Sequence, residues 1–318
     1  MINLPKLRTV PMPAPDAHPA AVYLARLSPG SRPTMRAALD AIAGVLTNGH
    51  HSAESLPWPQ LRYQHTQAVR EKLAEGHSPA TVNKMLCALR GVLKECWRLN
   101  LMTAEAYQRA ADLKAVQGER ILRGRALGAG EITALFSACA ADRSDAGARD
   151  AAILAVLYPA GLRRSEAAQL RREDYDPETG ALIVRTGKGN KERIVYLSNG
   201  SMDAMNDWIA VRGEDAGPLF WRSRKGGRVM SGAGVTAQAI WRALEKRRIE
   251  AGVRPFSPHD LRRTVIGDLL DAGADISIVQ QLAGHANVTT TQRYDRRPEQ
   301  AKQKAASLLH VPYISRRT

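Results

Sequence analysis

The sequence has few aromatic residues, few cysteines and no long apolar run. Aromatic side chains make up 5% of the 318 residues, so we expect aliphatic side chains to build the core. The longest stretch free of charge and strong polarity, residues 151–162, contains a proline and a glycine. It is shorter than the roughly 20 apolar residues that a membrane-spanning helix needs. The sequence therefore predicts no transmembrane helix.

Cysteine is scarce, and a targeting signal is not evident. Cys87, Cys96 and Cys139 are odd in number and lack the C-x-x-C spacing of a zinc or redox site. We predict that all three are reduced, buried and inert. The first twenty residues hold five prolines and no apolar signal core. We expect residues 1–19 to form a loose arm, in a cytoplasmic protein associated with a bacterial-type nucleoid.

Acidic residues are fewer than basic residues. Lys and Arg number 46 against 31 Asp and Glu, which gives a formal net charge of +15. A folded, basic protein attracts phosphate because binding releases condensed counterions. Nucleic acid is therefore the expected partner, and an anionic membrane surface is the weaker alternative.

Residues 20–117 show helical periodicity and no extended strand pattern, which predicts an all-α first domain. In its clearest helix, residues 78–99, Ser78 and Pro79 provide the cap and the first turn. The apolar stripe of this helix consists of Val82, Met85, Leu86, Leu89, Val92, Leu93 and Cys96. Its opposite face carries Lys84, Arg90 and Lys94, which are candidate DNA contacts, although such a face is as often only solvated.

A Gly- and Arg-rich segment, residues 118–130, predicts a linker, and its Arg123 and Arg125 are further candidate DNA contacts. Two β-branched runs, beginning at Ala181 and Arg193, predict a hairpin with Lys188 and Lys191 at its tip. Helical periodicity returns from Gly234 to Leu309. The relaxed dinucleotide motif at 232–237 lacks a preceding strand and a later acidic residue, so we interpret it as a loop entering a helix.

Four short motifs of the second half carry the chemistry: AGLRRSE at 160–166, GKGNKER at 187–193, HDLRRT at 259–264 and LAGHANVTTTQRY at 282–294. Taken singly, each residue has an ordinary structural explanation. Together they supply guanidiniums that can brace phosphate oxygens, imidazoles that can carry a proton, and a phenol that can attack phosphorus. Because no acidic cluster with metal spacing accompanies them, we expect cleavage without a metal or other cofactor. The glycines around Lys188 lack the spacing of a P-loop, so the sequence supports no ATP site.

The four motifs, in this order, resemble the catalytic domain of tyrosine recombinases, the phage-integrase family, and most closely its simple Xer-like members. The resemblance covers residues 127–296. It implies a mainly α protein with a small antiparallel β-sheet: an all-α core-binding domain at 20–117 and an α+β catalytic domain at 131–297, together a C-shaped clamp on DNA.

The resemblance also assigns roles to individual residues. Arg163 and Arg262 would hold the scissile phosphate, His259 and His285 would handle protons and contact the phosphate, and Tyr294 would be the nucleophile. Lys188 would protonate the leaving 5′-oxygen, and Glu166 would support Arg163. The partners implied are duplex DNA with paired half-sites and three further copies of the chain, with the tail 298–318 forming a helix that docks on a neighbouring protomer.

The residues leave other functions open. A type IB topoisomerase or a hairpin telomere resolvase has a similar active site but does not exchange partner strands. A catalytically silent DNA-binding regulator would be favoured if any catalytic position were substituted, and all six are filled. Site-specific recombination through a 3′-phosphotyrosine and a Holliday junction is the function that we predict.

Overall fold

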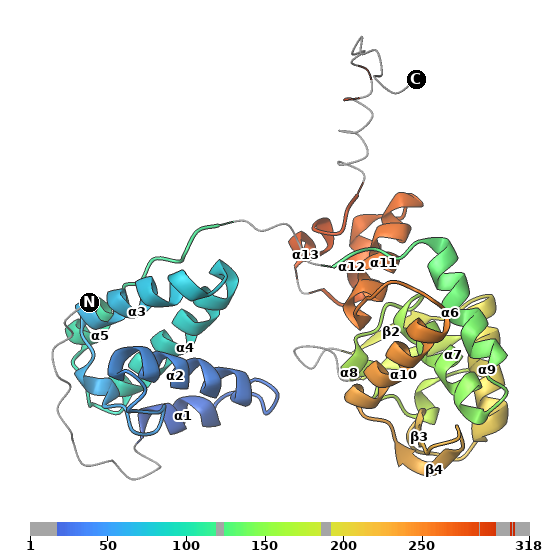
Figure 1. Ribbon diagram of the computed structural model, residues 1–318, viewed down its shortest axis with the longest axis horizontal. Coiled ribbons are helices and arrows are strands. Elements are labelled where there is room, and N and C mark those ends of the chain that lie inside the picture. Colours follow the sequence, from blue (N-terminus) through green and yellow to red (C-terminus); the bar gives the residue numbers. More distant parts are fainter. Residues whose placement is uncertain are drawn as a thin grey trace, which may run out of the picture. The chain divides into compact units, whose positions relative to one another are not determined.

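The computed structural model describes residues 18–118, 124–185, 192–285 and 287–296, together with Ala306 and Leu308. Residues 1–17 of the predicted arm, Arg123, the hairpin tip with Lys188 and Lys191, and most of the tail lie outside the described residues. Pro19, predicted as the end of the arm, instead begins the first helix. The chain divides into two compact units, Met1–Ile121 and Leu122–Thr318 (Figure 1). In the described part of the chain, no helix is long and apolar enough to cross a membrane.

The first unit is helical in its described part. Its elements are α1 (Pro19–Ala25), α2 (Arg32–Thr47), the short 3-10 helix η1 (Trp58–Gln60), α3 (Tyr63–Gly76), α4 (Pro79–Arg98) and α5 (Ala104–Ala111). Helix α4 contacts all the others, and the unit's core forms around it.

Helix α4 follows directly from its sequence. The Ser78 hydroxyl accepts a hydrogen bond from the Thr81 amide at 3.3 Å, and Pro79 occupies the first turn, where no amide hydrogen is needed. The predicted apolar stripe is buried, except for the half-buried Met85. Cys96 belongs to this stripe, and burial raises the pKa of its thiol to about 12. Cys87, in contrast, is exposed. Its predicted burial was wrong, because it lies off the stripe.

The second unit combines helices with two antiparallel hairpins. Its elements are α6 (Ala129–Ala141), α7 (Asp145–Leu157), α8 (Arg164–Ala167), η2 (Arg172–Asp174), β1 (Ala181–Val184), β2 (Arg193–Tyr196), α9 (Gly200–Arg212), β3 (Trp221–Ser223), β4 (Val229–Gly234), α10 (Ala237–Glu250), α11 (Pro258–Asp271), α12 (Ile276–Ala283) and α13 (Val288–Gln292). Helix α7 is buried along most of its length and packs on α6 and α9. The predicted mixture of an all-α part and an α+β part is confirmed.

One of the two hairpins was predicted from the sequence, and the other was not. Strands β1 and β2 pair antiparallel with Ala181 opposite Tyr196 and Val184 opposite Arg193, as the β-branched runs predicted. The hairpin of β3 and β4 was not predicted. Its strand β4 ends at Gly234, so the interpretation of residues 232–237 as a loop was wrong for their first half. The connection before β4 is charged and glycine-rich, and the register shifts between Trp221 and Ser223, which hides the two-residue period.

The described end of the predicted linker packs on the second unit. Leu127 is buried in that unit's core. The Arg125 guanidinium donates to the carbonyls of Arg254 and Pro255 and pairs with Glu131 at 2.6 Å. Helix α6 then begins at Ala129, two residues before the predicted domain start. Because Leu127 is a single apolar residue without periodic neighbours, the sequence did not predict that this segment packs on the second unit.

Candidate active site

Helix α11 presents His259 and Arg262 on one face, one turn apart. Its start is fixed by a reciprocal cap, in which the Asp260 carboxylate accepts hydrogen bonds from the Ser257 amide at 2.8 Å and from the Ser257 hydroxyl at 2.9 Å. Pro258 occupies the first turn. These capping residues lie within the HDLRRT motif or directly before it, so the motif also builds the helix that carries it.

Arg262 is buried, and its guanidinium donates to the carbonyls of Gly161 and Ala283. It makes no salt bridge within the described residues. Burial, with a further contribution from the nearby Arg163 charge, lowers the pKa of Arg262 to about 10. Gly161 turns the chain with a φ of 63°, a conformation that favours glycine. A cation held by carbonyls alone retains its full charge for an anion.

Arg163 precedes α8, and Glu166 lies one turn further on. The Glu166 carboxylate accepts from the Arg163 amide at 2.9 Å and from the Arg163 guanidinium at 2.6 Å. Arg163 also donates to the carbonyl of Gly284 at 3.2 Å, at the end of α12. The guanidinium is therefore tied to two segments, while its side chain remains 27% exposed.

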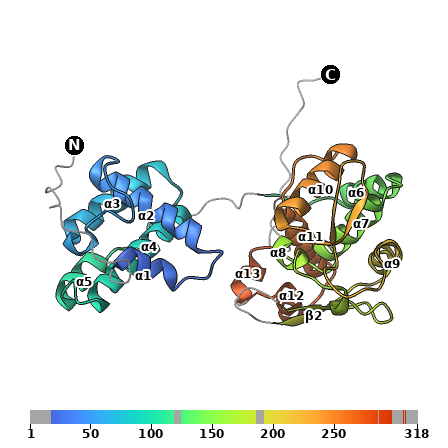
Figure 2. The ribbon, with the colours of Figure 1, turned by 90° about the horizontal axis from the view of Figure 1, so that it is seen from below.

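Tyr294 meets two histidines just after α13. Its hydroxyl lies 2.8 Å from Nε2 of His259. Its ring stacks on that of His285 with centroids 6.1 Å apart, and Nδ1 of His285 lies 2.9 Å from the Thr291 hydroxyl. Helices α8, α11, α12 and α13 bring these residues together from three motifs far apart in the sequence (Figure 2).

Both histidines are held in the neutral form. Burial lowers the pKa of His259, and the Arg262 charge lowers it further. Burial, with Arg262 and Arg163, lowers the pKa of His285 to about 4. A neutral imidazole at hydrogen-bond distance from a phenol can accept its proton.

Two arginines hold the segment that carries Tyr294. The guanidinium of Arg263 lies 5.6 Å from the centre of the Tyr294 ring, a cation–π distance, and donates to the Gly124 carbonyl at 2.6 Å. Arg296 bonds Asp268 and Asp271, both at 2.7 Å, on α11. The Tyr294 side chain is thus held beside the two histidines of its own chain.

An open cleft of about 440 Å³ lies beside this group, with Arg163, His259 and Arg262 in its lining. Trp241 of α10, 38% exposed, forms part of the wall. Sequence analysis missed this residue, although a lone tryptophan in a helix rich in charge was the available signal. It also missed Arg193, which contacts Glu166.

The remaining predicted residues fall into three groups. Lys84 and Lys94 are exposed on α4. Arg90 and Arg125 bind groups of their own units: Arg90 donates to the carbonyls of Ala111 and Leu113, and Arg125 makes the contacts described above. Lys188, Lys191 and Arg123 lie outside the described residues. Within the described ranges, no group of three or more His, Cys, Asp and Glu side chains is arranged to hold a metal ion.

Comparison with known proteins identifies relatives. Residues 125–300 match the model of the phage integrase family. The tyrosine recombinase XerC of Corynebacterium efficiens is 30% identical over 264 residues, which cover 80% of this chain and 79% of that protein. The tyrosine recombinase XerA of Pyrococcus furiosus is 36% identical over 148 residues, and this match spans 46% of this chain and 50% of that protein.

Solved structures share the fold. The XerH site-specific recombinase bound to its difH substrate has a TM-score of 0.63 at 24% identity, and the match covers 83% of this chain and 74% of that one. The Tn1549 transposon integrase in complex with transposon right end DNA has a TM-score of 0.65 at 15% identity, covering 92% and 99%.

Proposed function

Since this chain belongs to the phage integrase family of tyrosine recombinases, we propose that it recombines DNA at specific sites through a covalent 3′-phosphotyrosine on Tyr294. The observation that carries this proposal is the 2.8 Å distance between the Tyr294 hydroxyl and Nε2 of His259, beside the buried Arg262. His259 and Arg262 line one cleft, and the Tyr294 hydroxyl lies at hydrogen-bond distance from His259.

In the proposed reaction, the Tyr294 oxygen attacks the scissile phosphorus and its proton passes to His259. Arg163 and Arg262 bind the non-bridging oxygens as charge builds on them, and His285 donates a further hydrogen bond. The bond from phosphorus to the 5′-oxygen breaks, and Lys188 protonates the departing oxygen. The 5′-hydroxyl of a second strand then attacks the phosphotyrosine and gives its proton to Lys188. As the bond from phosphorus to the Tyr294 oxygen breaks, His259 returns its proton to that oxygen, which restores the phosphodiester and the free tyrosine. Because the bond energy is retained, the cycle needs no ATP.

Duplex DNA is the proposed partner of both units. The exposed Lys84 and Lys94 of α4 support backbone contacts by the first unit, because each can neutralise one phosphate. The net charge of +15 supports the same partner. The contacts made by Arg90 and Arg125 give these two residues structural roles within their own units.

The proposed assembly is four copies on two duplexes, joined by the tail. In residues 298–311 the apolar residues Ala301, Ala305, Leu308 and Leu309 have the sequence spacing of one helical stripe, which would suit docking on a neighbouring protomer. Truncation after Arg297 would then weaken the paired-site complex more than binding of one monomer to a half-site. Equal loss of both in a gel-shift titration would contradict docking in trans.

The chemistry is tested on a nicked suicide substrate. The cleaved strand diffuses away from it, so religation cannot occur and the covalent adduct is trapped. Wild-type protein should form the adduct. Tyr294→Phe should form none and bind DNA as before, because it loses only the nucleophilic oxygen. An adduct with the Phe variant would show that another residue attacks.

A further inference from the structure

Arg193 is a largely buried cation that the proposed mechanism leaves without a role. It opens strand β2, and its side chain is 11% exposed. Arginine is rarely buried to this extent without a partner. Its contacts therefore indicate what it does.

The Arg193 guanidinium joins two of the four motifs. It bonds the two carboxylate oxygens of Glu166 at 2.8 and 3.3 Å, and it donates to the Leu282 carbonyl at 3.1 Å. Gly284 packs against it so closely that a Cβ there would lie 3.1 Å from its side chain. Arg193 thus lies directly behind the residues that hold the candidate phosphate site.

Glu166 is shared between two guanidiniums. One oxygen accepts from Arg163 at 2.6 Å, and the other from Arg193 at 2.8 Å. The carboxylate is 2% exposed, so water screens these interactions weakly. With Arg193 present, the trio of Arg163, Glu166 and Arg193 keeps one net positive charge. Without it, Glu166 and Arg163 would form a neutral pair.

We propose that Arg193 is a positioning residue that balances the charge of Glu166, so that Arg163 is held in place by the carboxylate and still presents its positive charge to the scissile phosphate. The inference rests on the proposed function of the same site. The carboxylate of Glu166 orients Arg163. The positive charge of Arg193 offsets the negative charge of that carboxylate, so that Arg163 is not neutralised by the group that orients it.

The experiment compares two substrates at saturating protein, with the rate of covalent adduct formation as the readout. One has a phosphodiester at the scissile position, and the other a methylphosphonate, which lacks the negative charge. Four variants are compared with the wild type: Arg193→Gln, Arg193→Lys, Glu166→Gln and the double variant Arg193→Gln/Glu166→Gln. Thermal unfolding of each reports on folding.

Arg193→Gln should slow the phosphodiester reaction about 10- to 100-fold, the usual range for loss of a charged hydrogen bond, and slow the methylphosphonate reaction much less. The double variant has the wild-type net charge, so its ratio of the two rates should return toward the wild-type ratio. Glu166→Gln should shift the ratio in favour of the phosphodiester. Arg193→Lys, which keeps the charge, should hold the ratio near the wild-type value.

Equal slowing of both substrates by Arg193→Gln, or a double variant with the same ratio as Arg193→Gln, would overturn the proposal and leave Arg193 with a purely structural role. If Arg193→Gln does not fold, the ratios of Glu166→Gln and of the double variant decide the question in the same way. Absence of adduct with wild-type protein would instead contradict the proposed function.

Discussion

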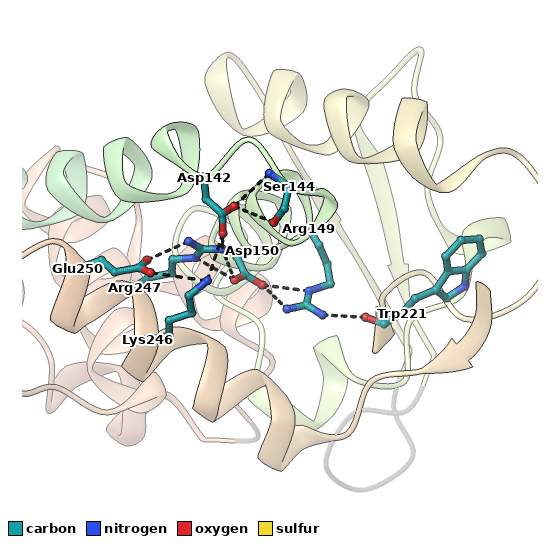
Figure 3. Close-up of polar contacts among 8 residues, drawn as sticks. All are labelled: Asp142, Ser144, Arg149, Asp150, Trp221, Lys246, Arg247 and Glu250. Carbon is teal, nitrogen blue, oxygen red and sulfur yellow. Dashed lines mark hydrogen bonds and ion pairs between the residues drawn. The ribbon is translucent and has the colours of Figure 1, made fainter. Parts of the chain in front are cut away.

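Two groups of charged residues in the second unit, each built around a buried arginine, differ in how their charges balance. The first, which we name the catalytic cluster after its proposed function, consists of Arg163, Arg193, Arg262 and Glu166, with three cations and one anion. The second, the α7–α10 network, has three cations and three anions (Figure 3). It consists of Asp142, Arg149, Asp150, Lys246, Arg247 and Glu250.

In the α7–α10 network, each buried cation meets a carboxylate. Asp150 accepts from Arg149 at 2.7 Å and from Arg247 at 2.9 Å, and Arg247 also bonds Asp142 and Glu250 (Figure 3). Burial alone would lower the pKa of Arg247, but Asp150 and Asp142 more than offset this and raise it. In the catalytic cluster, burial and Arg163 lower the pKa of Arg262. In the α7–α10 network the buried charges have partners within the fold, so removing one of them leaves another unpaired. In the catalytic cluster the excess of cations leaves positive charge free for an anion such as a phosphate.

The largest expected change is in stability, from breaking the balanced network. Asp150→Asn should lower the free energy of unfolding by about 3–5 kcal/mol, because it leaves Arg149 and Arg247 buried with too little negative charge. Urea unfolding measures this loss. Adduct formation by the folded fraction should stay within about threefold of wild type, because Asp150 contacts none of the catalytic cluster. A loss under 1 kcal/mol would show that the network is not the stabilising one.

Arg262→Gln should produce the opposite pattern. Adduct formation should fall about 10²- to 10³-fold, the usual effect of removing one group that stabilises transition-state charge. The free energy of unfolding should change by no more than about 1 kcal/mol, because lost hydrogen bonds to carbonyls are offset by relief of a buried charge. Single-turnover kinetics and urea unfolding of the same preparation test both. A large stability loss would remove the distinction between the two groups.

The sequence predicted three of the four residues of the catalytic cluster and none of the α7–α10 network, for a physical reason. Arg163, Arg262 and Glu166 lie in short motifs whose residue types suit phosphate chemistry, so their meeting could be expected. The α7–α10 network joins Asp142 to Arg247 across 105 positions, and nothing local marks either residue. Arg193 was missed although it lies in a motif, because its role depends on which carboxylate the fold brings to it. The stripe of α4 was predicted because its evidence is local, and β4 was missed because glycines obscured its period.

A smaller effect is expected in the pH dependence of stability, because the positive charges of the catalytic cluster act on His285. The pKa of His285 is about 4 in the folded protein, against 6.5 as its ordinary value. Between these values the unfolded chain binds a proton that the folded protein does not, so stability should fall as pH decreases from about 6.5 to about 4. His285→Asn should flatten this dependence, and Arg262→Gln should reduce it, since Arg262 helps to depress the pKa. Identical slopes in urea unfolding of wild type and His285→Asn would contradict this.

The smallest effect concerns Gly267, inside α11, where a Cβ would lie 2.7 Å from Nε of Arg296. Gly267→Ala should gain up to about 1 kcal/mol of helix stability. It should also displace Arg296 from Asp268 and Asp271, and partly exposed ion pairs such as these are worth at most about 1 kcal/mol. The net change in stability should therefore be within about 1 kcal/mol.

Adduct formation should nevertheless fall about three- to tenfold, because Arg296 follows Tyr294 by two residues and its displacement loosens the nucleophile. Gly44→Ala in α2 is the matched control, since a Cβ there meets nothing within 4 Å. It should gain the same helix stability and leave adduct formation unchanged. In an Arg296→Ala background the clash no longer exists, so Gly267→Ala should have no further effect on the rate. A further loss of rate in that background would mean that Gly267 acts on the site by a route other than displacement of Arg296. An unchanged rate for Arg296→Ala alone would mean that its ion pairs do not hold Tyr294 in place.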